Sequence, residues 1–191
     1  MTSDGMRGGP DGDRARQWGD RKSYRPSWDA RAEAAARMLP DGASILEIGV
    51  GAGAFRALVA GRHPYLGADL VPLDPETLPL DLDLDPLPAG TFDVVAMLGV
   101  LEYLHAPDEA LRKARASGRR ALFSYCCLKA GADRAQIVRK RRERGWINGW
   151  SRDELLASAG RAGWRVAREE PFNEGDDFYQ AIFLAEPSAK D

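Results

Sequence analysis

The chain has 191 residues, a net charge of −2 and 44% apolar residues. This composition predicts one domain with a real core, and the nearly balanced charge gives no reason to expect nucleic acid or an anionic membrane as the main partner. No apolar run approaches the roughly 18 residues that a membrane span needs, and the N-terminal residues lack the apolar region of a signal peptide, so we expect a cytoplasmic protein.

Residues 1–22 are rich in Gly, Asp and Arg and contain few apolar side chains, which predicts a disordered tail. We expect the folded domain over 23–187 and a second short tail over 188–191. The domain begins with a predicted helix over 27–39, for which Ser27 is a suitable N-terminal cap.

Strands and helices alternate through the rest of the domain, and a pair of strands closes it. We expect a strand over 44–50, a helix over 53–60, a strand ending at Asp69, a brief strand over 78–82, a strand over 91–98, a helix over 107–116, a strand over 120–125, a helix over 151–163, and strands over 164–172 and 177–187. Ser151 and Glu154 form a predicted capping box on the last helix. The segment 126–149 fits no element clearly.

This order predicts an α/β fold, a three-layer sandwich around a mostly parallel seven-stranded sheet with an antiparallel C-terminal hairpin. The last two strands must be antiparallel because their short connection cannot make a crossover. Ligands on such sheets bind outside the carboxyl ends of the strands. We therefore expect functional side chains at three strand ends, namely 47–53, Asp69 and 98–105.

A glycine-rich turn follows the first of these strands. Glu47 precedes glycines at 49, 51 and 53, and Asp69 lies 20 residues beyond Gly49. The turn also satisfies the dinucleotide fingerprint, so an NAD-type oxidoreductase is an alternative. However, the carboxylate of Glu47 would repel a pyrophosphate and attract a cationic amino acid head group. Gly53 also departs from the dinucleotide pattern, and the residues therefore favour S-adenosylmethionine.

The motif from Glu47 to Gly53 resembles the first motif of the class I S-adenosylmethionine-dependent methyltransferases. Residues 81–114 resemble their third and fourth strands, and residues 146–166 resemble their late helix and strand. The segment 115–125 lacks the usual Gly-rich turn and is similar to the MetW-like, type 11 group. The resemblance covers nearly the whole chain outside the tail, and it implies a Rossmann-like sandwich that binds S-adenosylmethionine.

The resemblance also implies roles for residues at the strand ends, all of them toward the cofactor. Glu47 would orient the methionine amino group, and Asp69 would accept both ribose hydroxyls. The backbone at Gly49, Gly51 and Gly53 would allow the cofactor to approach closely, and Asp81 and Leu82 would lie at the edge of its adenine. The carbonyl groups of Leu98 and Gly99 would accept hydrogen bonds from its amino group, and Tyr24 or Arg25 would close over its carboxylate. Asp81 lies near Asp83 and Asp85, and any of these three is equally suited to be a solvated residue.

Methyl transfer is an in-line displacement that needs positioning, and a base only when the acceptor loses a proton. Three residues near the fourth strand are candidate catalytic groups: Glu102, Tyr103 and His105. His105 titrates in the useful range but is also a typical surface residue at a helix start. We see no metal-ligand cluster. We expect a small or medium-sized acceptor, and a non-catalytic S-adenosylmethionine-binding domain is a further alternative.

Other candidates for the acceptor side are Tyr125 and Cys126, after the strand over 120–125, and a basic segment over 134–144. That segment is either a solvated helix face or an electropositive lid that attracts a phosphorylated, carboxylated or nucleic-acid substrate. Without interleaved aromatic residues it gives little reason to expect RNA, but it leaves a nucleic-acid partner open. We expect the tryptophans at 146, 150 and 164 to be core residues or hydrophobic staples and not a substrate cage. The sequence leaves the oligomeric state open.

Overall fold

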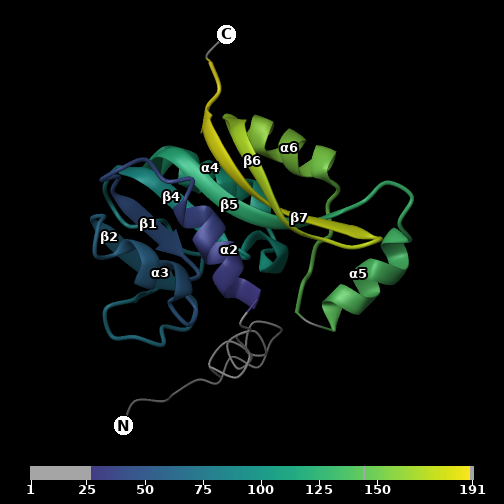
Figure 1. The fold of residues 1–191 in the computed structure, drawn as a ribbon, viewed down its shortest axis with the longest axis horizontal. Helices are drawn as coiled ribbons and strands as arrows, with labels where there is room; N and C mark the ends of the chain where they lie inside the picture. The colour runs from purple at the N-terminus through teal and green to yellow at the C-terminus, as the bar shows by residue number, and fades with distance from the viewer. Residues whose placement is uncertain (1–26, 144, 190–191) are drawn as a thin grey trace.

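The computed structural model describes residues 27–143 and 145–189, and Figure 1 shows a twisted sheet with helices on both of its faces. The predicted tail over 1–22 lies outside the described residues. In chain order the elements are α2 (Ser27–Ala36), β1 (Ile45–Ile48), α3 (Ala54–Val59), β2 (Tyr65–Asp69), β3 (Leu78–Pro79), β4 (Phe92–Leu98), η2 (Leu101–Tyr103), α4 (Pro107–Ser117), β5 (Gly118–Leu128), α5 (Arg134–Arg142), α6 (Arg152–Arg161), β6 (Trp164–Glu174) and β7 (Phe178–Pro187).

The seven strands form one sheet in the order β3-β2-β1-β4-β5-β7-β6. The first five strands pair in parallel, and β7 lies antiparallel between β5 and β6. This confirms the predicted α/β sandwich with its antiparallel C-terminal pair. The order reverses between β1 and β4, so the loops after these strands leave in opposite directions and open a crevice between them.

Apolar side chains cover both faces of the sheet, which gives the three layers. Leu46 of β1 belongs to a cluster with Leu111 of α4 and Leu155 of α6. Its neighbour Ile45 belongs to the cluster on the other face, with Phe55 of α3. Successive residues of a strand point to opposite faces of the sheet, so a strand that is buried on both faces is a continuous run of apolar residues. Because β1 is buried on both faces, the carboxylate of Glu47, the residue after Leu46, also lies in the interior.

Four elements show the main differences from the sequence-based expectation. β3 has only two residues, because Pro79 has no N–H to continue a ladder. The unassigned segment first extends β5 to Leu128, where β7 still pairs with it, and then forms α5, which Asp133 caps by accepting a hydrogen bond from Gln136 N at 3.0 Å. The first helix ends at Ala36, three residues earlier than expected.

The capping box on α6 is confirmed. The Ser151 hydroxyl accepts a hydrogen bond from Glu154 N at 3.3 Å, and Ser151 N donates to Glu154 Oε2 at 2.7 Å. These two bonds satisfy donors that a helix start otherwise leaves unpaired. Within the described part of the chain, no helix is long and apolar enough to cross a membrane.

Candidate active site

A cavity of about 180 Å³ opens at the carboxyl ends of β1, β2 and β4, at the crevice where the strand order reverses. Most of the predicted cofactor-binding residues line it: Glu47, Gly49, Gly51, Asp69, Asp81, Leu82, Leu98 and Gly99. Gly53 lies outside this lining, at the N-terminal cap of α3. The sheet therefore gathers residues that are up to 52 positions apart in the chain.

Glu47 is a buried carboxyl group at the end of β1, with 2% of its surface exposed. The Tyr65 hydroxyl donates a hydrogen bond to its Oε2 atom. Burial raises the pKa of Glu47 to about 8, against the opposing effects of the Tyr65 hydrogen bond and of the Arg31 and Arg56 charges. A cationic ligand group in the cavity would favour its ionised form.

Asp69 ties the glycine turn to the end of β2. Its Oδ2 accepts a hydrogen bond from Gly51 N at 2.7 Å, and its Oδ1 accepts one from Val71 N at 3.1 Å. Burial raises the pKa of Asp69, and these backbone donors act in the opposite direction. Each carboxylate oxygen has a second lone pair, so the group can also accept hydrogen bonds from a ligand.

Gly49 is the position where the turn needs glycine most. Its φ of +82° lies in the left-handed region, and a Cβ atom there would come within 2.5 Å of Val100 Cγ2. Gly49 N also donates to Ala68 O at 2.8 Å, which holds the turn against β2. The fixed backbone leaves room for a ligand above the turn.

Asp81 and Leu82, the two candidates for the adenine edge, follow β3. Leu82 is buried, and Asp81 is half-buried with its Oδ1 accepting a hydrogen bond from Asp83 N at 3.0 Å. Both residues line the cavity. Tyr24 and Arg25, the predicted contacts of the carboxylate, lie outside the described residues.

Arg31 of α2 is a residue that sequence reasoning missed. Its side chain lines the first cavity and approaches Gly99 so closely that a Cβ on Gly99 would lie 2.2 Å from Nη1. Burial lowers the pKa of Arg31, and the neighbouring Glu102, Tyr103 and Glu47 act in the opposite direction. Nothing in the sequence of α2 distinguishes Arg31 from an exposed helical arginine.

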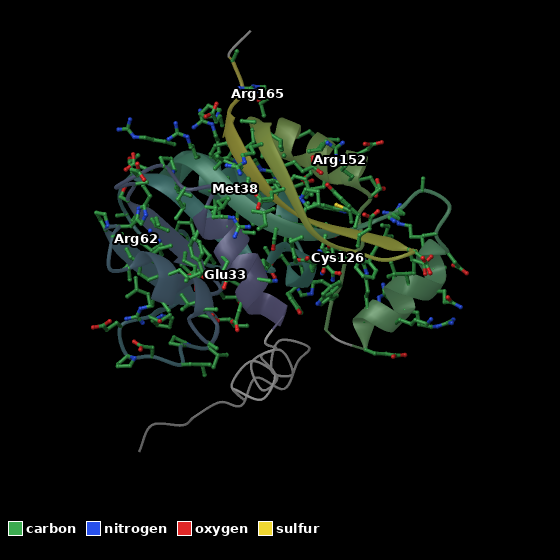
Figure 2. All side chains as sticks on the ribbon, viewed as in Figure 1. Glu33, Met38, Arg62, Cys126, Arg152 and Arg165 are labelled. Atoms are coloured by element: carbon green, nitrogen blue, oxygen red, sulfur yellow. The ribbon has the colours of Figure 1, made fainter. Side chains whose placement is uncertain are left out.

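A second cavity, of about 640 Å³, shares Arg31 and Gly99 with the first. Its other lining residues come from α2, η2, β5, α5, the segment after α5 and the β6–β7 hairpin: Ala30, Glu102, Cys126, Ile137, Lys140, Arg141, Trp146, Phe172, Asn173, Asp177, Phe178 and Gln180. In Figure 2, Cys126 lies between α2 and α5. Cys126 lines this cavity, and so does Trp146, which is half-buried and, contrary to the expectation, does not belong to the core.

The three catalytic candidates occupy different environments. Glu102 is buried beside the second cavity, where its Oε1 accepts a hydrogen bond from Cys126 N at 3.0 Å and its buried Oε2 has no hydrogen-bond partner among the described residues. Burial raises the pKa of Glu102. Tyr103 lines the first cavity. His105 is exposed, bonds to Asp83 through Nδ1 at 3.1 Å, and lines neither cavity.

Some residues of the basic segment 134–144 form a solvated face, and others line the second cavity. Arg139 and Arg142 are exposed, as a solvated face requires, and Arg134 pairs with Glu154 at 2.6 Å. Lys140, which is also exposed, and the buried Arg141 line the second cavity. Arg144 lies outside the described residues. In the part of the chain that the structure describes, no group of three or more acidic, His or Cys side chains could hold a metal ion.

Solved structures share this fold. They include the 1,6-didemethyltoxoflavin-N1-methyltransferase of Burkholderia thailandensis (TM-score 0.69, 17% identity, 94% of this chain and 87% of that chain). The magnesium protoporphyrin IX methyltransferase ChlM of Synechocystis PCC 6803 has a TM-score of 0.65 and 18% identity, over 91% of this chain and 92% of that chain. The cyclase SpnF has a TM-score of 0.66 and 17% identity, over 85% of this chain and 81% of that chain. At these identities the likeness establishes the fold alone.

The sequence itself identifies the family. Residues 16–169 match the profile of a family described as a methyltransferase domain, which covers well over half of the chain. No curated protein gives a significant match. The family match favours S-adenosylmethionine over a dinucleotide as the ligand of the turn after Glu47. The chain therefore belongs to the methyltransferase domain family, within the class I S-adenosylmethionine-dependent methyltransferases.

Proposed function

We propose that this methyltransferase binds S-adenosylmethionine in the first cavity and methylates a small or medium-sized organic acceptor in the second. The observation that carries this proposal is that the two cavities meet at Arg31 and Gly99. Methyl transfer is an in-line displacement, so donor and acceptor need adjoining chambers with a common boundary. All described lining residues fall within the predicted domain 23–187.

The chemistry of the first cavity fits the cofactor. Glu47 offers a carboxylate to the methionine amino group, and Arg31 offers a cation to the methionine carboxylate. Asp69 has lone pairs left for the ribose hydroxyls. Asp81 supplies a polar edge and Leu82 an apolar surface for adenine. Backbone carbonyls at the end of β4 supply further acceptors for the amino group.

When bound, S-adenosylmethionine supplies an electrophilic methyl group, and the electron pair of its carbon–sulfur bond stays on the sulfur. A lone pair of the acceptor atom forms the new bond to the methyl carbon. A hydroxyl or amine acceptor also loses a proton, and we assign the Oε2 atom of Glu102 to receive it. This assignment is supported by the absence of a described hydrogen-bond partner for Oε2 and by its burial, which raises the pKa and hence the basicity of Glu102. His105 receives no role.

Calorimetric titration with S-adenosylhomocysteine tests the cofactor site. We expect micromolar binding that Asp69→Ala and Gly51→Val each weaken strongly, because one removes the ribose acceptor and the other fills the turn. Asp41→Ala is the matched control, since Asp41 is exposed and precedes the amino end of β1, whereas the cavity lies at the carboxyl end. Wild-type affinity in both turn variants would contradict the assigned site.

Incubation with methyl-labelled S-adenosylmethionine and a metabolite extract tests the transfer. We expect label in a small molecule, and we expect Glu102→Gln to slow its appearance without changing the affinity for S-adenosylhomocysteine. Cofactor binding without label in any extract component would favour the non-catalytic binding domain instead.

A further inference from the structure

We propose that the acceptor is a planar, aromatic small molecule that carries an anionic group, either a carboxylate or a phosphate. This inference rests on the acceptor role proposed above for the second cavity. The anionic group would lie at Arg141 and Lys140, and the planar body would lie against Trp146, Phe172 and Phe178.

Arg141 is the residue that most requires an anion. Only 6% of its surface is exposed, and its described hydrogen-bond partners are uncharged. Nη1 donates to Cys126 O at 2.9 Å, Nη2 donates to Cys126 Sγ at 3.1 Å, and the guanidinium carbon lies 5.1 Å from the centre of the Trp146 ring. Buried cations are normally paired with an anion, because burial of an unpaired charge is costly. An anionic acceptor would supply the partner from within the cavity.

The other charges of the lining do not neutralise Arg141 fully. Lys140 adds a second positive charge from the same helix. The lining holds three cationic side chains, Arg31, Lys140 and Arg141, and two carboxyl groups, Glu102 and Asp177. Lys140 and Asp177 are both exposed, so solvent and salt screen both of these charges, whereas Arg141 is buried. The interior of the cavity therefore attracts anions.

The apolar part of the lining is aromatic and comes from three separate elements. Trp146 follows α5, Phe172 belongs to β6 and Phe178 begins β7, and all three rings are only partly buried. Partly buried rings keep some surface available to a ligand, and aromatic surfaces favour planar partners through stacked or edge-on contacts. A volume of about 640 Å³ lies within the range of cavities that bind drug-sized ligands.

Fractionation of the acceptor tests the charge. A metabolite extract of the source organism is separated on an anion exchanger at neutral pH, and each fraction is incubated with the enzyme and methyl-labelled S-adenosylmethionine. We expect label only with the retained fraction, in a product that absorbs ultraviolet light. Phosphatase treatment of that fraction then assigns the anion: lost labelling indicates a phosphate, and persistent labelling indicates a carboxylate. Labelling from the flow-through, or from neither fraction, would overturn the proposal.

A pair of charge reversals tests the site. Lys140→Glu should raise the apparent KM for the retained fraction by about tenfold or more, and should abolish the increase in melting temperature that this fraction gives to the protein bound to S-adenosylhomocysteine. Arg139→Glu makes the same charge change one position earlier on α5, where the side chain is exposed and outside the cavity, and should do neither.

Calorimetry with S-adenosylhomocysteine separates the two levels of inference. Both charge variants should bind it with wild-type affinity, because neither residue lines the first cavity. If the wild type does not bind it, the proposed function fails. If binding is intact but the two variants lose activity equally, or neither loses any, the anionic acceptor at α5 is wrong.

Discussion

The affinity for S-adenosylhomocysteine should rise with pH below neutrality, because Glu47 has to lose a proton before it can hold an ammonium group. Burial raises the pKa of Glu47 to about 8 in the free protein, so the uncharged carboxylic acid predominates at pH 7. Only the ionised form attracts the methionine ammonium. Since deprotonation increases as the pH approaches 8, the sign of the effect is tighter binding at higher pH.

The size of the effect follows from that pKa. With a pKa of about 8, roughly one-tenth of Glu47 is ionised at pH 7 and roughly one-hundredth at pH 6. The dissociation constant should therefore fall about tenfold from pH 6 to pH 7, which corresponds to about 1.4 kcal/mol of binding free energy. The ligand ammonium stays charged in this interval, because an α-amino group has a pKa near or above about 8.

Calorimetric titrations at the two pH values, each in two buffers with different ionisation enthalpies, measure both the affinity and the protons released. The wild type should release close to one proton per ligand bound near pH 7. Glu47→Gln should bind more weakly and lose most of the pH dependence, whereas Glu33→Gln, which alters an exposed carboxylate of α2, should behave as the wild type. A flat affinity in the wild type, with no proton release, would refute the reasoning.

Three further predictions follow from individual residues. Gly49→Ala should destabilise the fold by about 1–3 kcal/mol in thermal melts, because alanine is strained at that φ and its Cβ would clash with Val100; an unchanged melting temperature would contradict this. Ser151→Ala should cost about 0.5–2 kcal/mol in urea denaturation through loss of the α6 cap, a loss that Ser151→Asp should largely avoid. Glu102→Gln should lower kcat by about 10²-fold or more, whereas His105→Ala should leave kcat unchanged, and the reverse pattern would refute the assignment of the base.

Local sequence patterns determined the sheet and most of the cofactor cavity. The continuous apolar runs of the central strands predicted burial on both faces, and the strand ends then placed Glu47 and Asp69 at one edge, because parallel strands end together. The capping box at Ser151 was predictable because its donors and acceptors lie within one helical turn. Each of these inferences depends on residues that are close in sequence or on a general property of parallel sheets.

The tertiary structure alone decided the second cavity, which is the proposed acceptor site. Arg31, Arg141 and Trp146 meet there through the packing of α2, α5 and the hairpin of β6 and β7 around the end of β5, and no local pattern predicts that arrangement. The same packing turns Arg141 inward while Arg139, two positions earlier, stays in solvent. The sequence determines which side chains are charged, but the free energy of burying a charge depends on neighbours that only the folded chain brings together.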